Sequence, residues 1–307
     1  MAKTPTLAGP RFEISLGDEA YPWLLATMQD APKRLYGIGN PDALKPGIAV
    51  IGTRKATPYG LAAARRFARH AAQRAVPIIS GGARGCDQEA HKAALEMGAP
   101  TVVVFGSGPD VVYPRMGAKL FQQVIDAQGV VISENPWGTP PLGHTFLRRN
   151  RIIAGLSMLL VIAEAGMPSG TFSTADAALA ADRCVAAVPG SISSPYSKGA
   201  NFLISQGATP LVDETSLDMA IDAAFAHLPL SVMEKPPVED AASQWDEMLE
   251  GDALLAALAA ESYTPGELTA YFGFSAAELG SRLSQYEMAG LVERGRDGRY
   301  QAVRGSL

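Results

Sequence analysis

The chain has 307 residues, of which 47% are hydrophobic and 19% are charged. This composition is typical of a globular protein with a large core and excludes an intrinsically disordered chain. No apolar run approaches the roughly 20 residues that a membrane-spanning helix needs. The first residues also lack the apolar segment of a signal peptide, so we expect a cytoplasmic protein with no membrane partner.

The charge is unevenly distributed along the chain. The formal net charge is −5, which at first argues against a nucleic-acid partner. Residues 47–165, however, contain 13 Lys and Arg against 7 Asp and Glu, a net charge of +6. Salt screens charges over about 8–10 Å, so a basic segment in an acidic chain favours a localised anion-binding site. Within this segment, we interpret four arginines as the solvated face of a helix: Arg65, Arg66, Arg69 and Arg74.

From residue 47 the chain alternates short apolar runs with segments of helical periodicity. Near-continuous apolar strands between helices are typical of a parallel sheet that is covered on both faces. The sequence therefore predicts an α/β fold with an extended Rossmann-like parallel sheet over residues 47–228. The expected strands span residues 48–52, 76–80, 101–106, 129–133, 158–165, 184–189 and 208–212. The expected helices span residues 58–75, 87–98, 116–127, 173–182 and 215–226.

Three further segments flank the predicted domain. We expect residues 1–46 to form a short lead-in that packs on the sheet. Residues 229–244 are rich in proline and charge, which is typical of a linker. Residues 245–307 contain three helical patterns and then a strand–turn–strand pattern around Asp297-Gly298. This order is the outline of a small C-terminal winged-helix-like domain.

Four predicted loops after strands of the sheet are rich in glycine, small polar residues and arginine. Ligands of parallel sheets bind at the carboxyl ends of the strands. A glycine after a strand is more often a simple turn, but four such loops at one edge form a composite anion site. Helix N-termini and arginines hold phosphates there, and an aromatic ring stacks on a base. The residues concerned are Gly52, Thr53, Arg54 and Lys55; Ser80, Gly81, Gly82, Arg84 and Gly85; Phe146, Arg148, Arg149, Asn150 and Arg151; and Ser169, Gly170 and Thr171.

The sequence contains no recognisable catalytic motif. It has no GxxxxGK[ST] segment, and its Gly106-Ser107-Gly108 segment does not continue as a dinucleotide fingerprint. Cys86 and Cys184 match no metal or redox spacing, and the four histidines show no metal spacing. Cys86 and His91 point to different faces of the expected helix, which argues against a nucleophile pair. We therefore expect no catalytic residue, no metal and no cofactor.

Seven segments resemble the DNA processing protein A (DprA/Smf) family. They occur in the family's order over roughly residues 20–213, and LRRNRIIAGLS is long and particular to this family. The C-terminal module also resembles the winged-helix-like domain that many members carry. The seven segments are AVIGTRKATPYG, SGGARGCDQEAHKAAL, DVVYP, LRRNRIIAGLS, SGTFST, AVPGS and KGANFLISQGATPLV.

The resemblance implies a non-enzymatic protein that binds single-stranded DNA without sequence specificity. It also implies a homodimer that loads RecA onto DNA in natural transformation and recombination. The residues that it implies for DNA binding are Gly52 to Arg54, Ser80 to Gly85, Phe146, Arg148 to Arg151, Ser169 to Thr171, and Lys198.

The sequence departs from the family pattern in three places. We expect the helical domain that precedes the sheet in many members to be missing or reduced to a remnant. Gly82 and Cys86 stand where many members have larger apolar residues. The expected recognition helix, residues 275–290, has Arg282 against Glu278 and Glu287. A helix that reads duplex DNA needs positive charge to meet phosphates, so we expect that this module does not hold DNA by that helix. A weak backbone contact by the wing arginines and a protein-contact or dimer-stabilising role both remain open. The wing arginines are Arg294, Arg296 and Arg299.

Two other functions are compatible with a Rossmann-like sheet. The first is a nucleotide-handling enzyme, such as a nucleoside monophosphate phosphoribohydrolase of the lysine-decarboxylase-like type. The PGGxGT-type motif of those enzymes is only faintly echoed by residues 168–171, with no glutamate at Ser173 or Thr174. The second is a winged-helix transcription regulator, which the acidic C-terminal module argues against.

Overall fold

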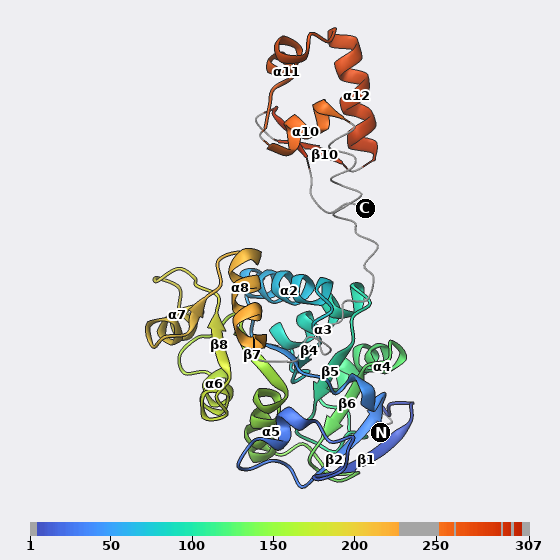
Figure 1. Ribbon diagram of the computed structural model, residues 1–307, viewed down its shortest axis with the longest axis vertical. Helices are drawn as coiled ribbons and strands as arrows, with labels where there is room; N and C mark the ends of the chain where they lie inside the picture. The colour runs from blue at the N-terminus through green and yellow to red at the C-terminus, as the bar shows by residue number, and fades with distance from the viewer. Residues whose placement is uncertain (1–4, 227–251, 261, 290, 296–297, 303–307) are drawn as a thin grey trace. The chain divides into compact units, whose positions relative to one another are not determined.

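A computed structural model describes residues 5–226, 252–260, 262–289, 291–295 and 298–302. The chain divides into two compact units, Met1–Glu234 and Lys235–Leu307, and Figure 1 labels most of their elements. The predicted linker at residues 229–244 lies outside the described residues. Within the described ranges, no helix has the length and apolar character that a membrane crossing requires.

The first unit is built on a nine-stranded sheet with the order β1-β2-β6-β5-β4-β3-β7-β8-β9. Strands β3 to β9 are parallel to one another, whereas β1 and β2 are antiparallel additions at one edge. The predicted Rossmann-like α/β fold is therefore confirmed. The strands are β1 (Arg11–Ser15), β2 (Arg34–Gly39), β3 (Gly47–Ile51), β4 (Ile78–Ser80), β5 (Thr101–Val104), β6 (Val130–Ser133), β7 (Ser157–Ile162), β8 (Cys184–Ala187) and β9 (Thr209–Pro210).

Helices cover both faces of this sheet (Figure 1). Alternate residues of β3 enter different cores: Ile48 and Val50 pack with α2, α3 and α8, whereas Ala49 and Ile51 pack with α1, α5, α6 and α7. This alternation explains why the strand sequence is apolar at every position. The helices are α1 (Trp23–Ala26), α2 (Pro58–Gln73), α3 (Cys86–Glu96), α4 (Ala118–Asp126), α5 (Gly143–Leu156), α6 (Thr171–Ala180), α7 (Lys198–Ser205) and α8 (Glu214–Phe225), with short 3-10 turns η1 (Pro41–Ala43) and η2 (Arg115–Gly117).

Residues before position 47 enter the sheet itself and do not only pack on it. β2 pairs antiparallel with β6, and β1 pairs antiparallel with β2 at the edge. In β1, Phe12 and Ile14 alternate with the polar Arg11, Glu13 and Ser15. Such alternation is typical of an antiparallel edge strand with one buried face, and it is the signal that the sequence analysis missed.

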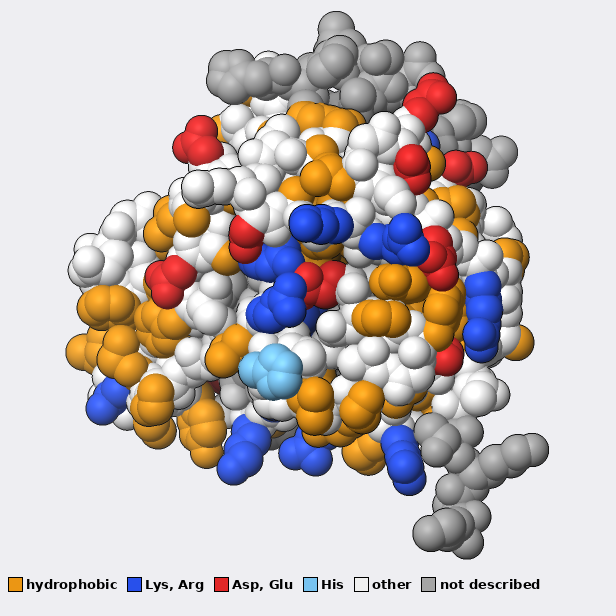
Figure 2. All heavy atoms as spheres, turned by 90° about the horizontal axis from the view of Figure 1, so that it is seen from below, with side chains coloured by type: hydrophobic (Ala, Val, Ile, Leu, Met, Phe, Trp, Pro, Cys, Tyr) orange, Lys and Arg blue, Asp and Glu red, His pale blue; other side chains and the backbone are white. Residues whose placement is uncertain are grey.

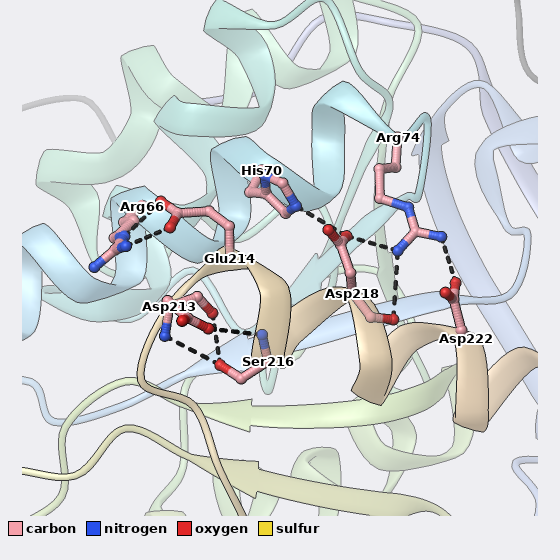
Figure 3. Close-up of polar contacts among 8 residues, drawn as sticks. All are labelled: Arg66, His70, Arg74, Asp213, Glu214, Ser216, Asp218 and Asp222. Carbon is pink, nitrogen blue, oxygen red and sulfur yellow. Dashed lines mark hydrogen bonds and ion pairs between the residues drawn. The ribbon is translucent and has the colours of Figure 1, made fainter. Parts of the chain in front are cut away.

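Three of the four arginines that were interpreted as a solvated face, Arg65, Arg66 and Arg74, form ion pairs with acidic residues of α3 and α8. Figure 3 shows Arg66 of α2 pointing to Glu214 of α8, and Arg74 reaching Asp218 and Asp222. Arg65 pairs with Glu89 and Glu96 of α3. The side chains of Arg65 and Arg66 are 41% and 49% exposed, so they lie at the surface as interpreted, but they form ion pairs there. These pairs neutralise part of the positive charge of residues 47–165.

We expect acid to weaken the contact between α2 and α8. Burial alone raises the pKa of Asp218, but hydrogen bonds from His70 and Arg74 outweigh it and hold this pKa below its usual value. A carboxyl group with a lowered pKa stabilises the fold above its unfolded pKa of about 3.9, and this stabilisation disappears as the pH falls through the folded value. Asp218→Asn should lower the free energy of unfolding by at most about 1 kcal/mol at neutral pH, because the ion pairs of Asp218 with His70 and Arg74 are partly exposed. Urea unfolding at about pH 7 and about pH 3 should show a smaller acid-induced loss in the variant than in the wild type; an equal loss would contradict this.

The second unit has three helices followed by a two-stranded hairpin in its described residues. Leucines of all three helices share one core, and capping boxes at Thr264 and Ser275 begin the second and third helices. The predicted element order is present, while the winged-helix assignment stays a prediction. Arg296 and Asp297 of the expected turn lie outside the described residues. The elements are α10 (Ala253–Ala260), α11 (Pro265–Phe272), α12 (Ala276–Met288), β10 (Val292–Arg294) and β11 (Tyr300–Ala302).

Candidate nucleic-acid interface

A cleft of about 440 Å³ lies in the first unit between the end of β3, α5 and the start of α6. The strand order reverses at this place, because β4 and β7 flank β3 on opposite sides. Open parallel sheets bind ligands at such a switch point. The cleft gathers residues from all four predicted segments, although the second contributes only Ala83. The others are Gly52, Thr53, Arg54 and Lys55; Phe146, Arg149 and Asn150; and Ser169, Gly170 and Thr171.

The third segment, residues 144–151, lies in the helix α5, so the prediction of a loop is wrong. The helical spacing decides which side chains reach the cleft. Phe146, Arg149, Asn150 and Ile153 stand at positions i, i+3, i+4 and i+7, and all four line it. The two remaining arginines of the segment pair instead with the buried Glu134 after β6.

Arg149 is held inside the fold and does not reach outward. It is only 4% exposed, and its Nη1 donates hydrogen bonds to the carbonyl oxygens of Gly81 and Val104, each at 2.6 Å. A Cβ at Gly81 would lie 2.0 Å from this Nη1, so a larger residue there would displace the guanidinium. Burial lowers the pKa of Arg149 to about 10. Arg149 therefore joins the second glycine-rich loop to β5 and is not an exposed phosphate ligand as predicted.

The second loop folds around the carboxylate of Asp87, which belongs to the first turn of α3. Asp87 accepts hydrogen bonds from the backbone N–H groups of Gly81 (3.2 Å) and Ala83 (3.3 Å). Burial raises the pKa of Asp87, and the charge of Arg149 opposes that rise. Gly85 adopts φ +93°, and a Cβ there would lie 2.4 Å from the carbonyl oxygen of Thr53, so the first two loops touch through their backbones.

The N-terminus of α2 is also occupied by a carboxylate of the protein. Glu164, which follows β7, is 3% exposed and accepts hydrogen bonds from the backbone N–H of Thr57 at 2.8 Å and from its Oγ1 at 2.5 Å. The Thr57 hydroxyl in turn caps α2 by accepting from the N–H of Gly60. Because Glu164 occupies the positive end of α2, this helix does not offer its N-terminus to a phosphate as predicted, and α3 has two acidic residues, Asp87 and Glu89, in its first turn.

In contrast to Glu164 at α2, no carboxylate in the described part of the chain is hydrogen-bonded at the N-terminus of α6. Its first turn, residues 171–174, contains no acidic residue. The Ser169 hydroxyl accepts hydrogen bonds from the N–H of Thr171 at 3.3 Å and from its Oγ1 at 2.8 Å. Asn150 donates to Ser173 at 2.8 Å and so ties α5 to α6. The role of the fourth segment in anion binding stays a prediction, and the absence of an acidic residue from this first turn is compatible with it.

Three exposed cations remain at or beside the cleft. Arg54 and Lys55 line it, and Arg84 follows the lining residue Ala83. None of the three forms an ion pair with another residue in the described part of the chain. The Arg54 guanidinium lies 5.8 Å from the centroid of the Phe146 ring, within reach of a cation–π contact. These side chains are available to meet a strand of phosphates.

The other predicted residues have different surroundings. Arg148 is 62% exposed and pairs with Glu134 at 3.1 Å, whereas Arg151 is largely buried between Glu134 and Asp30. Ser80 is buried and donates to the carbonyl oxygen of Val50. Lys198 is exposed at the start of α7, and the described lining of the cleft does not include it. Figure 2 shows Lys and Arg side chains near the centre of one face, with hydrophobic side chains on both sides.

The buried cysteine and histidine near the cleft have no nucleophilic character. Burial raises the pKa of Cys86 to about 12, so its thiol stays protonated at neutral pH. His91 is fully buried, bonds to the Thr101 hydroxyl at 2.7 Å, and has a pKa lowered to about 3 by burial. Across the described residues, no group of His, Cys, Asp and Glu is arranged to hold a metal ion.

Comparison with known proteins identifies the family. The family model for DNA recombination-mediator protein A matches residues 13–222. The chain belongs to this family. Protein Smf of Escherichia coli K12 is 34% identical over 284 residues, which cover 91% of this chain and 74% of that protein. DNA processing protein DprA of Streptococcus pneumoniae is 42% identical over 196 residues, which cover 64% of this chain and 69% of that protein.

Solved structures of two family members resemble the first unit. The X-ray structure of DprA from Streptococcus pneumoniae has a TM-score of 0.64 at 37% identity and covers 70% of this chain and 75% of that one. The second structure is DNA processing protein A from Helicobacter pylori, which is described as having a unique single-stranded DNA binding mode. It has a TM-score of 0.63 at 27% identity, and the match covers 71% of this chain and 99% of that one. The family resemblance of the seven sequence segments is thereby confirmed.

Membership of this family decides between the functions that the sequence left open. The family consists of recombination mediators that are not enzymes, so the chain has a role in DNA processing and the enzyme alternative is excluded. The prediction of a non-enzymatic member of the DprA/Smf family is confirmed.

Proposed function

We propose that this protein binds single-stranded DNA without sequence specificity at the cleft between β3, α5 and α6. One observation carries the proposal. Arg54, which forms no ion pair with the described residues, lies over the Phe146 ring, and both residues line the cleft at the switch point of the sheet. The single-stranded DNA binding of the Helicobacter pylori family member supports the same role for this chain.

The contacts available at the cleft suit a strand of any sequence. Arg54, Lys55 and Arg84 provide positive charge for the backbone, and the first turn of α6 provides N–H groups. Phe146 offers an aromatic surface for a base. Phosphate contacts and stacking do not distinguish one base from another. Arg149 acts in this proposal as a positioning residue that holds the loops and not as a phosphate ligand.

The expected result is a salt-sensitive preference for single strands. A fluorescently labelled thymidine oligonucleotide and a matched duplex are titrated with the protein, and fluorescence anisotropy gives each affinity at about 50 mM and about 200 mM salt. The single strand should bind at least about tenfold more tightly than the duplex, and its affinity should fall with salt. Equal affinities for the two forms would overturn the proposal.

Family membership extends the proposal to partners and location. We infer that the protein acts as a homodimer in the cytoplasm and loads RecA onto the bound strand in natural transformation and recombination, as the sequence resemblance implies. In this proposal the second unit contacts protein. Two of its arginines already have partners within the unit, because Arg282 lies over the Phe274 ring and Arg299 pairs with Glu267. RecA assembly on a labelled single strand, with and without the protein, tests the loading step.

A further inference from the structure

Tyr113 is the more exposed of two aromatic rings that meet at the mouth of the cleft. It lies in the loop between β5 and η2, is 43% exposed, and has its ring centroid 5.2 Å from that of Phe146 at an interplanar angle of 43°. Phe146 is only partly exposed. The Arg54 guanidinium lies over its ring, and the backbone of Gly106 is so close that a Cβ there would lie 2.7 Å from its Cδ1. Of the two rings, Tyr113 is therefore the more open to a flat ligand.

The loop that carries Tyr113 is held in place by its own hydrogen bonds. The Ser107 hydroxyl donates to the carbonyl oxygen of Val111 at 2.7 Å, and Asp110 accepts from the N–H of Gly138 at 2.8 Å. Val112 is buried directly before the tyrosine. The Tyr113 hydroxyl makes no hydrogen bond with any described residue, so the exposed ring is not kept there by its polar end. A rigid aromatic side chain on a fixed loop loses little conformational entropy when it stacks on a ligand.

Two further cations follow this ring along the chain. Arg115, at the start of η2, and Lys119, in the first turn of α4, are both exposed. Neither forms an ion pair with the described residues. An exposed aromatic ring next to unpaired cations is the combination that binds single-stranded nucleic acid, because bases stack on the ring while phosphates meet the cations.

We propose that Tyr113 stacks on a base of the bound single strand and extends the interface from the cleft onto the loop before η2. This inference rests on the proposed function. The strand passes from Arg54 and Phe146 to Tyr113, and its backbone then meets Arg115. In this arrangement Phe146 supports the Tyr113 ring from behind as well as facing the cleft.

Replacement of Tyr113 by alanine tests the stacking. Tyr113→Ala should weaken binding of a labelled thymidine oligonucleotide about fivefold or more, the usual effect of losing one base–aromatic stack. The slope of log affinity against log salt should stay at the wild-type value, because no charge is removed. Tyr113→Phe keeps the ring and should bind within about twofold of wild type. Trp23→Ala removes an aromatic side chain of similar exposure, 49%, on α1 and should leave the affinity unchanged.

A strand of the same length without bases separates stacking from a change in loop shape. Wild type and Tyr113→Ala should bind this abasic strand equally, because it offers phosphates but nothing to stack. An equal loss on both strands, with thermal unfolding unchanged, would overturn the stacking proposal, and so would normal binding of the thymidine strand by Tyr113→Ala. If wild type itself shows no preference for single strands, the proposed function fails first, and the two failures are thus distinguishable.

Discussion

Arg149→Met is expected to destabilise the first unit by about 3–5 kcal/mol, the usual cost of removing one partner from a buried charged network. The substitution removes the donor to the carbonyl oxygens of Gly81 and Val104. It also leaves the buried Asp87 carboxylate without the charge that opposes the rise of its pKa. Urea unfolding of the full-length protein measures the change. For a domain of this size, the midpoint of thermal unfolding should fall by roughly 6–20 °C.

A double variant serves as the control for this prediction. Asp87→Asn removes the buried negative charge, so Asp87→Asn/Arg149→Met should be less destabilised than the sum of the two single variants. Arg34→Ala removes a 51% exposed arginine of β2 that pairs with Glu13 on the surface, and it should change the stability by less than about 1 kcal/mol. A similarly small effect for Arg149→Met would contradict the positioning role derived from its contacts.

Arg54→Ala should lower the affinity for single-stranded DNA about tenfold, since a hydrogen bond to a charged group contributes about 1.5–3 kcal/mol. Arg54 is exposed and lies over Phe146, so it can meet a phosphate without breaking an internal ion pair. The slope of log affinity against log salt should become shallower by about 0.7, which corresponds to one phosphate contact with a single strand. Fluorescence anisotropy over a salt series measures both quantities.

Arg34→Ala is again the matched control, because it removes the same charge from a position outside the lining of the cleft. It should leave the salt slope at the wild-type value. An Arg54→Ala variant with wild-type affinity and slope would remove this residue from the interface. The affinity should fall by a similar factor on thymidine and on mixed-sequence strands, because a phosphate contact does not read the base.

The parallel sheet was predictable because its strands are apolar at nearly every position. Residues 48–52 and 158–165 were expected as strands, and β3 and β7 lie there side by side. The strands β1 and β2 were missed, because an edge strand with one solvent-exposed face alternates polar and apolar residues and has a weaker signal. The helix α5 was taken for a loop, since its first turns contain few of the regularly spaced apolar residues that mark an amphipathic helix.

It was harder to predict which charged residues are exposed and which are buried than to predict that they lie close to one another. The sequence indicated that the four segments meet at one edge of the sheet, and residues of all four line the cleft. It did not distinguish Arg54, which is exposed, from Arg149, which is buried between two carbonyl oxygens. It also did not indicate that Glu164 satisfies the N-terminus of α2. A glutamate at the end of a buried apolar strand was the available signal, because a charge at that depth needs a partner.

The sequence by itself determined the family, the Rossmann-like sheet and the edge of that sheet where the candidate residues meet. Those properties depend on local patterns: apolar runs, glycines after strands and long motifs in a fixed order. Only the tertiary structure decided which of the charged side chains face solvent and which are paired with other residues of the fold. Burial and pairing depend on contacts between residues far apart in the chain, such as Arg149 with Gly81 and Glu164 with Thr57. The sign and number of charges in a segment therefore do not reveal how many of them remain available for DNA.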